Sequence, residues 1–165
     1  METGRLLRHL LAPAWRLRRV FTPAVLAAIE RAVKASETQH RGEIRFAVEG
    51  GLELADLLRD RGTRARAVEV FSRLRVWDTE ENTGVLIYVQ WVDRRVEIVA
   101  DRGIARRVPQ AEWARICRAM ELSFRAGRFG DGAVEAVDAV GRLLAEAFPA
   151  GRDNPDELSN RPVLL

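Results

Sequence analysis

Cysteine is almost absent from this sequence. Cys117 is the single cysteine among 165 residues, so the chain can form neither an intrachain disulfide nor a cysteine-rich zinc site. Histidine is also scarce: His9 and His40 are the only two, and they lie too far apart for a histidine metal motif. These absences leave carboxylates as the candidate metal ligands.

Long hydrophobic runs are missing as well. The longest uncharged run near the N-terminus, residues 10–15, contains Pro13 and ends at Arg16. A secretory signal needs about 7–15 consecutive apolar residues, and a membrane-spanning helix needs about 20. We therefore expect a cytoplasmic protein with no signal peptide and no transmembrane helix.

A strong excess of charge is missing too. The net charge is +3, and residues 1–20 hold five arginines and one glutamate, a net +4, which leaves −1 for the remainder. The residues after position 20 are close to neutral and lack the excess of positive charge typical of nucleic-acid-binding proteins, so we expect no nucleic-acid partner. Four of the five leucines of the basic leader, residues 1–21, cluster near its start: Leu6, Leu7, Leu10 and Leu11. These leucines either rest on an anionic membrane or pack back onto the domain.

The remaining sequence fits one α/β domain. Strands are predicted at residues 43–49, 85–91 and 95–100, where β-branched and aliphatic residues dominate. Only a few residues separate the last two strands, which predicts an antiparallel hairpin. The long connection after residues 43–49 predicts a parallel pair with the first hairpin strand. Most of the predicted helix boundaries lie at a capping residue, a glycine or a proline. The predicted helices are Thr22 to about Ser36, residues 52–58, Thr63 to near Trp77, Pro109 to Gly127, and a last one ending at Pro149.

The predicted fold is a single-domain α/β/α sandwich, in which helices flank a small mixed sheet made of a parallel pair and a hairpin. We expect the leader to end at residue 21 and the domain to span residues 22–149. Residues 150–165 are polar and interrupted by proline, which predicts a loosely ordered tail whose terminal apolar residues dock on the domain. We expect residues 1–20 to be dispensable for folding.

Acidic residues are predicted to gather at one rim of this sheet. A hairpin turn centred on Asp93 would pair Leu86 with Ala100 and Val85 with Asp101. The rim would then collect four candidate metal ligands, Asp78, Glu80, Glu81 and Asp101, and five neighbours that are not ligands, His40, Asn82, Gly84, Arg102 and Gly103. Calcium takes six to eight oxygen ligands and would suit such a cluster. The alternative is a solvated acidic loop that pairs with Arg41, Arg102 or Arg106.

No catalytic motif accompanies these acids. The sequence contains no G-x-S-x-G nucleophile elbow and no phosphate-binding glycine loop. It also lacks the C-x5-R and D-x-D-x-[TV] patterns of established phosphatases. We therefore name no catalytic residue from the sequence.

Two segments carry a family resemblance. Residues 82–104 contain N-x-G-V-L-I-Y-V followed by D-R-R-V-E-I-V-A-D-R-G-I, and residues 124–132 contain F-R-A-G-R-F-x-x-G. With the preceding Gly-Glu-Ile strand, these segments resemble the TPM-domain family, which includes plant thylakoid-lumen proteins and bacterial membrane-associated proteins. The resemblance covers roughly residues 22–149 and implies a small α/β/α sandwich.

The resemblance also implies a function. Family members look like accessory factors for membrane protein complexes, some calcium-binding and some acid phosphatases. Where relatives commonly carry an aspartate before the first strand, this chain has Gln39, His40 and Arg41. We therefore expect a non-enzymatic interaction module with a membrane-associated protein partner and weak calcium binding. The alternative is a metal-assisted acid phosphatase that hydrolyses phosphomonoesters.

Overall fold

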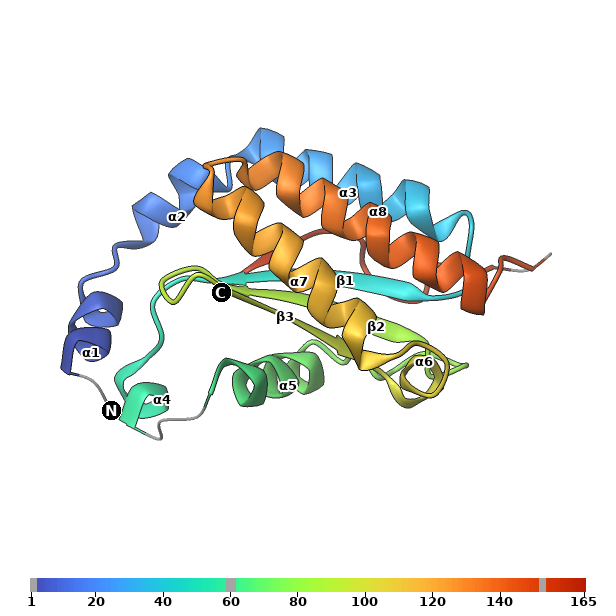
Figure 1. Ribbon diagram of the computed structural model, residues 1–165, viewed down its shortest axis with the longest axis horizontal. Coiled ribbons are helices and arrows are strands. Elements are labelled where there is room, and N and C mark those ends of the chain that lie inside the picture. The colour runs from blue at the N-terminus through green and yellow to red at the C-terminus, as the bar shows by residue number, and fades with distance from the viewer. Residues whose placement is uncertain (1–2, 59–61, 152–153) are drawn as a thin grey trace.

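The computed structural model describes residues 3–58, 62–151 and 154–165, and its helices and strands follow the predicted order closely (Figure 1). In chain order the elements are α1 (Thr3–Leu10), α2 (Ala14–Val20), α3 (Pro23–Glu37), β1 (Glu43–Glu49), α4 (Leu54–Leu58), α5 (Thr63–Arg73), β2 (Gly84–Gln90), β3 (Arg95–Ala100), α6 (Arg102–Ala105), α7 (Gln110–Arg125), α8 (Phe129–Ala147) and β4 (Val163–Leu164). The N-cap prediction for α3 is confirmed, because Thr22 Oγ1 accepts a hydrogen bond from Val25 N at 3.3 Å.

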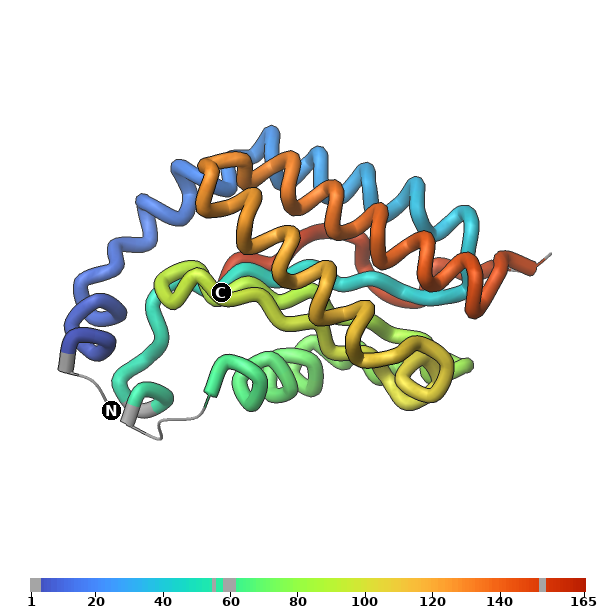
Figure 2. Tube along the Cα trace, in the orientation of Figure 1, coloured from blue at the N-terminus to red at the C-terminus, as the bar shows by residue number. Residues whose placement is uncertain are grey.

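The sheet has four strands in the order β3-β2-β1-β4. The parallel pairing of β1 with β2 and the antiparallel pairing of β2 with β3 are confirmed. The fourth strand was not predicted: β4 runs parallel to β1, with Ala47 opposite Val163. The terminal residues therefore do dock on the domain, and they do so as an edge strand (Figure 2).

The predicted register of the hairpin is wrong by one residue. Val85 lies opposite Ala100, and Leu86 lies opposite Val99. The turn holds four residues, 91–94, because Arg94 adopts a φ of 53° and its N–H donates to Trp91 O at 3.2 Å. Asp101 consequently lies just beyond β3, although its N–H still donates to Gly84 O at 2.9 Å.

Helices cover both faces of the sheet. Figure 1 shows α3, α7 and α8 above it and α5 below it. The larger core joins the upper helices to Ile44, Phe46 and Val48 of β1, and the smaller core joins α5 to the opposite face of the sheet. These layers confirm the predicted α/β/α sandwich.

The predicted end of α5 needs correction. Val68 is exposed, and the helix ends at Arg73 rather than near Trp77. Its buried face is formed by Ala67, Val70 and Phe71, which follow the spacing of one helical side.

The leader packs on the domain, but not through Leu7, Leu10 or Leu11. Leu17 of α2 and Phe21 belong to the larger core. His9 of α1 is buried, its Nδ1 accepts from Leu52 N at 3.1 Å, and its Nε2 donates to Asp93 Oδ1 at 3.0 Å. Leu7, Leu10 and Leu11 stay exposed, so the leader is fixed on one side and open on the other.

Candidate functional sites at the two ends of the sheet

The sheet has two chemically different ends. One end, here called the acid end, holds the first residues of β1 and β2, the last residues of β3, and α6. The opposite end, here called the turn end, holds the last residues of β1 and β2 and the hairpin turn, residues 91–94. Strands β1 and β2 each have seven residues, so the two ends lie about 20 Å apart.

Asp101 is the predicted metal ligand with the most unusual environment. It caps the short helix α6, and its Oδ1 accepts from Arg102 N at 2.7 Å. Its side chain is 7% exposed, and Oδ2 has no hydrogen-bond partner among the residues that the structure describes. A buried carboxylate oxygen without a partner loses hydration without replacement, so this atom suits a cation.

Two backbone carbonyls pack against Gly103, two residues after this aspartate. A Cβ on Gly103 would come within 2.6 Å of Asn82 O and 2.8 Å of Glu81 O, so only glycine allows the two chain segments to approach. Asn82 itself has a φ of 57°, which turns the chain toward Gly84. Calcium binds backbone carbonyl oxygens as well as carboxylates. This rim therefore offers it the unpaired Oδ2 of Asp101 and backbone oxygens.

The other predicted ligands are less suited to a shared ion. Glu81 forms an ion pair with Arg41, and Asp78 forms one with Arg75 at 3.5 Å. Glu80 is exposed, and its N–H donates to Glu157 Oε2 at 2.8 Å. Across residues 3–58, 62–151 and 154–165, no three of the four predicted ligands have carboxylate oxygens within 4.8 Å of one another. Calcium at this rim therefore stays a prediction, with Asp101 as its best-placed residue.

His40 lies at the acid end but is fully buried below α3 and α8. Its Nδ1 accepts from Gly42 N at 3.2 Å, so Nε2 carries the proton and donates to Ser36 Oγ at 2.8 Å. Burial lowers the pKa of this imidazole, which keeps it neutral. His40 therefore stabilises the connection between α3 and β1 and does not face the rim.

A second acidic group at this end was missed in the sequence. Ligand oxygens of Glu37, Glu43 and Asp156 lie within 4.8 Å of one another. Burial raises the pKa of Glu37 to about 8 and that of Glu43 to about 7. Glu37 Oε1 accepts from Ile44 N at 2.9 Å, and Glu43 Oε2 accepts from Leu158 N at 3.1 Å. These contacts assign the group to attachment of the tail, residues 154–165.

Buried charges at the turn end are paired. Arg66 of α5 binds Glu49 at the end of β1, with Nη2 2.5 Å from Oε1 and Nε 3.0 Å from Oε2. The hydroxyl of Tyr88 donates to the same carboxylate. Arg66 also contacts Asp56 at 3.2 Å and Glu69 at 3.1 Å. The hydrogen bonds and opposite charges outweigh desolvation and raise the pKa of Arg66, so the network is charged.

The hairpin turn fixes the leader through Asp93. Arg5 Nη2 lies 2.8 Å from Asp93 Oδ2, and His9 contacts the other carboxylate oxygen. Burial alone would raise the pKa of Asp93, but the hydrogen bonds from Arg5 and His9 lower it. The carboxylate therefore stays ionised and ties α1 to the turn.

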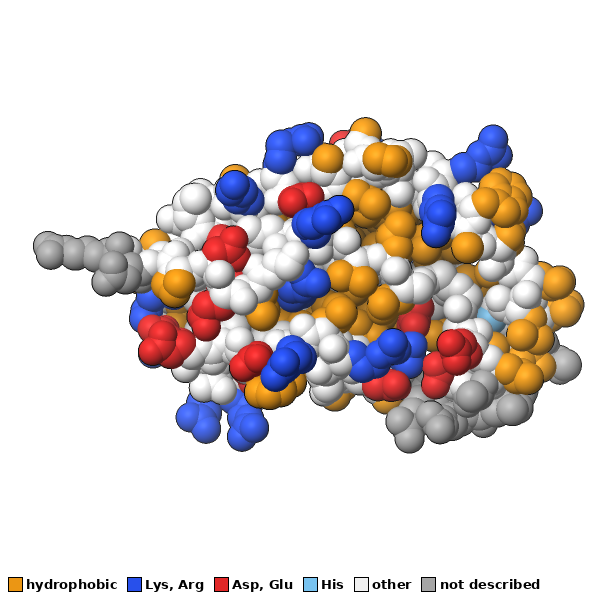
Figure 3. Space-filling model, turned by 180° about the vertical axis from the view of Figure 1, so that it is seen from behind, with side chains coloured by type: hydrophobic (Ala, Val, Ile, Leu, Met, Phe, Trp, Pro, Cys, Tyr) orange, Lys and Arg blue, Asp and Glu red, His pale blue; other side chains and the backbone are white. Residues whose placement is uncertain are grey.

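Large hydrophobic side chains are exposed mainly at the turn end. Among the described residues, six of the nine such side chains form what we call the apolar surface: Leu7, Leu10, Leu11, Trp15, Leu54 and Leu165. Leu7 and Leu11 line one shallow hollow with Arg8 and Arg16, and Leu10 lines another with Leu54 and Leu165. Figure 3 shows hydrophobic side chains at this end of the molecule with basic ones nearby.

Comparison with known proteins identifies the family. The sequence pattern of the TPM domain matches residues 17–143, more than three quarters of the chain. The chain belongs to the TPM-domain family. It is also similar to the BA42 protein from the psychrophilic bacterium Bizionia argentinensis, solved by NMR, with 33% identity, a TM-score of 0.77, and coverage of 87% of this chain and 94% of that one. A comparison with curated proteins finds no match.

The matched TPM region contains the acid rim and the hairpin turn, while α1 and the tail lie outside it. Among the residues described, no helix is long and apolar enough to cross a membrane. Cys117, on α7 of the TPM domain, is half-buried, and burial raises the pKa of its thiol to about 12. The thiol therefore stays protonated near neutral pH and is no ready nucleophile.

Proposed function

We propose that this TPM domain is a non-enzymatic accessory module that works at an anionic membrane surface, which it contacts through the apolar surface of its turn end. One observation carries the proposal: exposed leucines and Trp15 lie beside arginines on helices whose opposite side is fixed to the domain. An apolar face next to basic side chains is the pattern of a helix that lies in the membrane interface.

The charges of the leader favour an anionic membrane over a protein partner as the occupant of this surface. Residues 3–20 contain five arginines and no acidic residue. Arg8, Arg16, Arg18 and Arg19 are exposed, and each basic residue near an anionic surface contributes about 1 kcal/mol. Arg16 and Arg19 also lie 5.5 Å and 5.3 Å from the ring centroid of Trp15, an amphipathic group that prefers the interface.

Membrane contact at the turn end would leave the acid end facing away from the lipid. That end then suits a membrane-associated protein partner and weak calcium binding at Asp101. We expect weak binding because Glu81 and Asp78 are already paired with arginines. Calcium sites with few charged ligands have dissociation constants of about 10⁻⁴–10⁻³ M.

A metal-assisted phosphomonoesterase remains the alternative function. The orphan oxygen of Asp101 is the feature that favours it, because a cation held there would polarise a phosphoryl oxygen. A test is hydrolysis of a generic phosphomonoester by highly purified protein and by Asp101→Asn. Hydrolysis that persists through purification and is lost in Asp101→Asn would establish the alternative and refute the non-enzymatic proposal.

Vesicle sedimentation tests the membrane proposal. The protein should sediment with phosphatidylglycerol vesicles and stay in the supernatant with phosphatidylcholine vesicles. Leu7→Gln/Leu11→Gln should weaken sedimentation at least about tenfold, because two apolar side chains no longer leave water. Arg16→Gln/Arg19→Gln should weaken it by a similar factor, and the loss should shrink at high salt.

Leu122→Gln is the matched control, because Leu122 is 62% exposed on α7, outside the apolar surface. This variant should sediment like the unchanged protein. Equal loss in Leu122→Gln and in Leu7→Gln/Leu11→Gln would contradict the proposal, and so would equal binding to both kinds of vesicle.

A further inference from the structure

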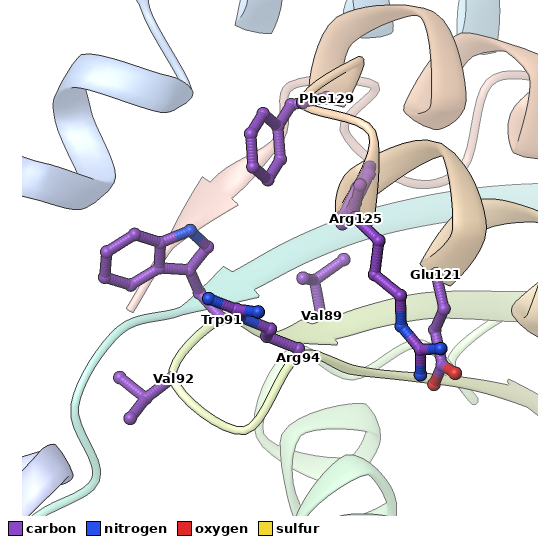
Figure 4. A pocket seen from close by; sticks show the side chains of 9 residues that line it. Val89, Trp91, Val92, Arg94, Glu121, Arg125 and Phe129 are labelled. Carbon is purple, nitrogen blue, oxygen red and sulfur yellow. The ribbon is translucent and has the colours of Figure 1, made fainter.

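A separate cavity opens at the turn end, beside the hairpin turn. It has a volume of about 370 Å³ and lies between residues 91–94, the end of α7 and the start of α8. Figure 4 shows Trp91 and Phe129 on its walls, with Val89, near the end of β2, below Phe129 and beside Trp91. Ligands of open α/β sheets bind outside the carboxyl ends of strands, and pockets for small molecules measure about 300–1,000 Å³.

The apolar wall of this cavity is continuous with the core. The ring centroids of Phe124 and Phe129 lie 5.1 Å apart, and Phe129 also packs edge-on against the buried Phe21 at 6.2 Å. Such ring contacts hold the wall in place before any ligand arrives. A ligand entering here would therefore bury apolar surface against a preformed site.

The charges that line the cavity favour an anion. Arg94 and Arg125 are exposed at it, and the hydrogen bonds and ion pairs of the described residues leave both guanidinium groups without a partner. Glu121 is the single acid in the lining, and its Oε1 already accepts from Val96 N at 3.1 Å. The lining thus carries a net +1, which matches a ligand with one negative charge.

The backbone at Arg94 supports a role for its side chain. Its φ of 53° lies in the left-handed region, where glycine or asparagine is the favoured residue of a turn. An arginine is unfavourable in this backbone conformation. A binding role for its guanidinium group would explain why an arginine occupies the position.

We infer that this cavity binds a small anionic amphiphile, namely a carboxylate on a single apolar chain such as a medium-chain fatty acid. The chain would lie against Trp91, Phe124 and Phe129, and the carboxylate would accept hydrogen bonds from Arg94 and Arg125. The small volume excludes a lipid with two chains. This site borders the apolar surface, because Trp91 and Val92 also line the hollow of Leu7 and Leu11, but it binds its ligand from solution.

Titration with monomeric decanoate, followed by amide NMR shifts, tests this site. Shifts should concentrate at residues 89–94 and 121–129, with a dissociation constant on the order of 10⁻⁴ M for a ligand of this size. Decanol, which keeps the chain and loses the charge, should bind at least about tenfold more weakly. Arg94→Gln/Arg125→Gln should weaken decanoate by a similar factor and leave decanol unchanged, since both side chains are exposed and their loss leaves the core intact.

Two controls separate this site from other surfaces. Arg142→Gln removes an exposed arginine of α8 outside the cavity and should bind decanoate normally. Leu7→Gln/Leu11→Gln should also bind it normally, even if vesicle binding is lost. Equal affinity for decanol and decanoate, shifts centred on α1, or unchanged affinity in Arg94→Gln/Arg125→Gln would each overturn the inference.

Discussion

The two ends of the sheet treat buried charge in opposite ways. At the turn end, Glu49 is buried against Arg66, and Asp93 lies between Arg5 and His9. At the acid end, Glu37 and Glu43 are buried near each other and near Asp156, and among the described residues Arg45 is the only opposite charge that affects Glu37. Buried charges that are paired with opposite charges form a rigid base for a binding surface. Buried carboxylates without such a partner instead bind protons or cations readily.

This difference suggests a division of roles. The turn end combines fixed helices, exposed leucines and arginines, so its binding should depend on apolar contact and anionic charge. The acid end combines the orphan oxygen of Asp101 with the buried glutamates, so its behaviour should depend on calcium and pH.

Arg66→Met should have the largest effect. It would leave Glu49 buried without an opposite charge, which makes the turn end resemble the acid end. Breaking a buried ion pair from one side costs about 3–5 kcal/mol of unfolding free energy, measured by chemical denaturation. Arg64→Met is a suitable control, because Arg64 is exposed and its contact with Glu97 spans 3.5 Å. Equal losses in both variants would show that the Glu49 network is not special.

Calcium should stabilise the acid end by a smaller amount. With a dissociation constant of about 10⁻⁴–10⁻³ M, 10 mM calcium adds roughly 1.4–2.7 kcal/mol to the unfolding free energy. Magnesium should add less, because it gives up its waters reluctantly. The measurement is a thermal melt with and without each ion. Asp101→Asn should abolish the calcium shift, while Glu80→Gln, an exposed neighbour, should retain most of it; a shift that both variants keep would place the ion elsewhere.

The buried glutamates should make stability fall as pH rises. Their pKa values in the folded state, about 8 for Glu37 and about 7 for Glu43, exceed the ordinary value of 4.5. Between these limits the folded state binds protons that the unfolded state has released, so raising the pH favours unfolding. Among the described residues, the charged groups that face Glu37 are Glu43, Asp156 and Arg45. The hydrogen bond from Ile44 N and the charge of Arg45 oppose the rise in its pKa but do not cancel it.

Denaturation at pH 5.5 and at pH 8 measures this effect. The loss of unfolding free energy should be at least about 1 kcal/mol, because one pKa unit is worth about 1.4 kcal/mol and two groups titrate in this range. Glu37→Gln should reduce the loss, because the amide still accepts a hydrogen bond from Ile44 N and carries no charge. A loss that is unchanged in Glu37→Gln would have to arise from other groups.

The fold was largely predictable from local signals. The Thr22 cap, the alternation of Ile44, Phe46 and Val48, and the short hairpin connection each act over a few residues and agree with the sandwich. The predicted register was wrong because the four-residue turn places Arg94 at a φ of 53°, a conformation that an arginine in the sequence does not indicate. Strand β4 has only two residues and depends on long-range pairing, so no local pattern marks it.

The candidate sites were less predictable. Asp101 was found because hairpin geometry returns it to the rim. The group of Glu37, Glu43 and Asp156 requires the tail to fold back onto β1, which sequence spacing cannot show. The sequence did contain one signal of a buried charged layer. Glu43, Arg45 and Glu49 occupy one face of β1, whose other face is apolar. Charged residues in this pattern either face solvent or are buried together.

Two exposed tryptophans at opposite ends allow the most direct test of membrane contact at the turn end. Trp15 is 53% exposed on the apolar surface, and Trp77 is 47% exposed at the acid end. In a Trp91→Phe background we would measure fluorescence quenching by brominated phosphatidylglycerol vesicles, comparing Trp77→Phe, which keeps Trp15, with Trp15→Phe, which keeps Trp77; Trp113 is buried in both. The account predicts strong quenching in Trp77→Phe and much weaker quenching in Trp15→Phe. Stronger quenching in Trp15→Phe, or equal quenching in both, would contradict it.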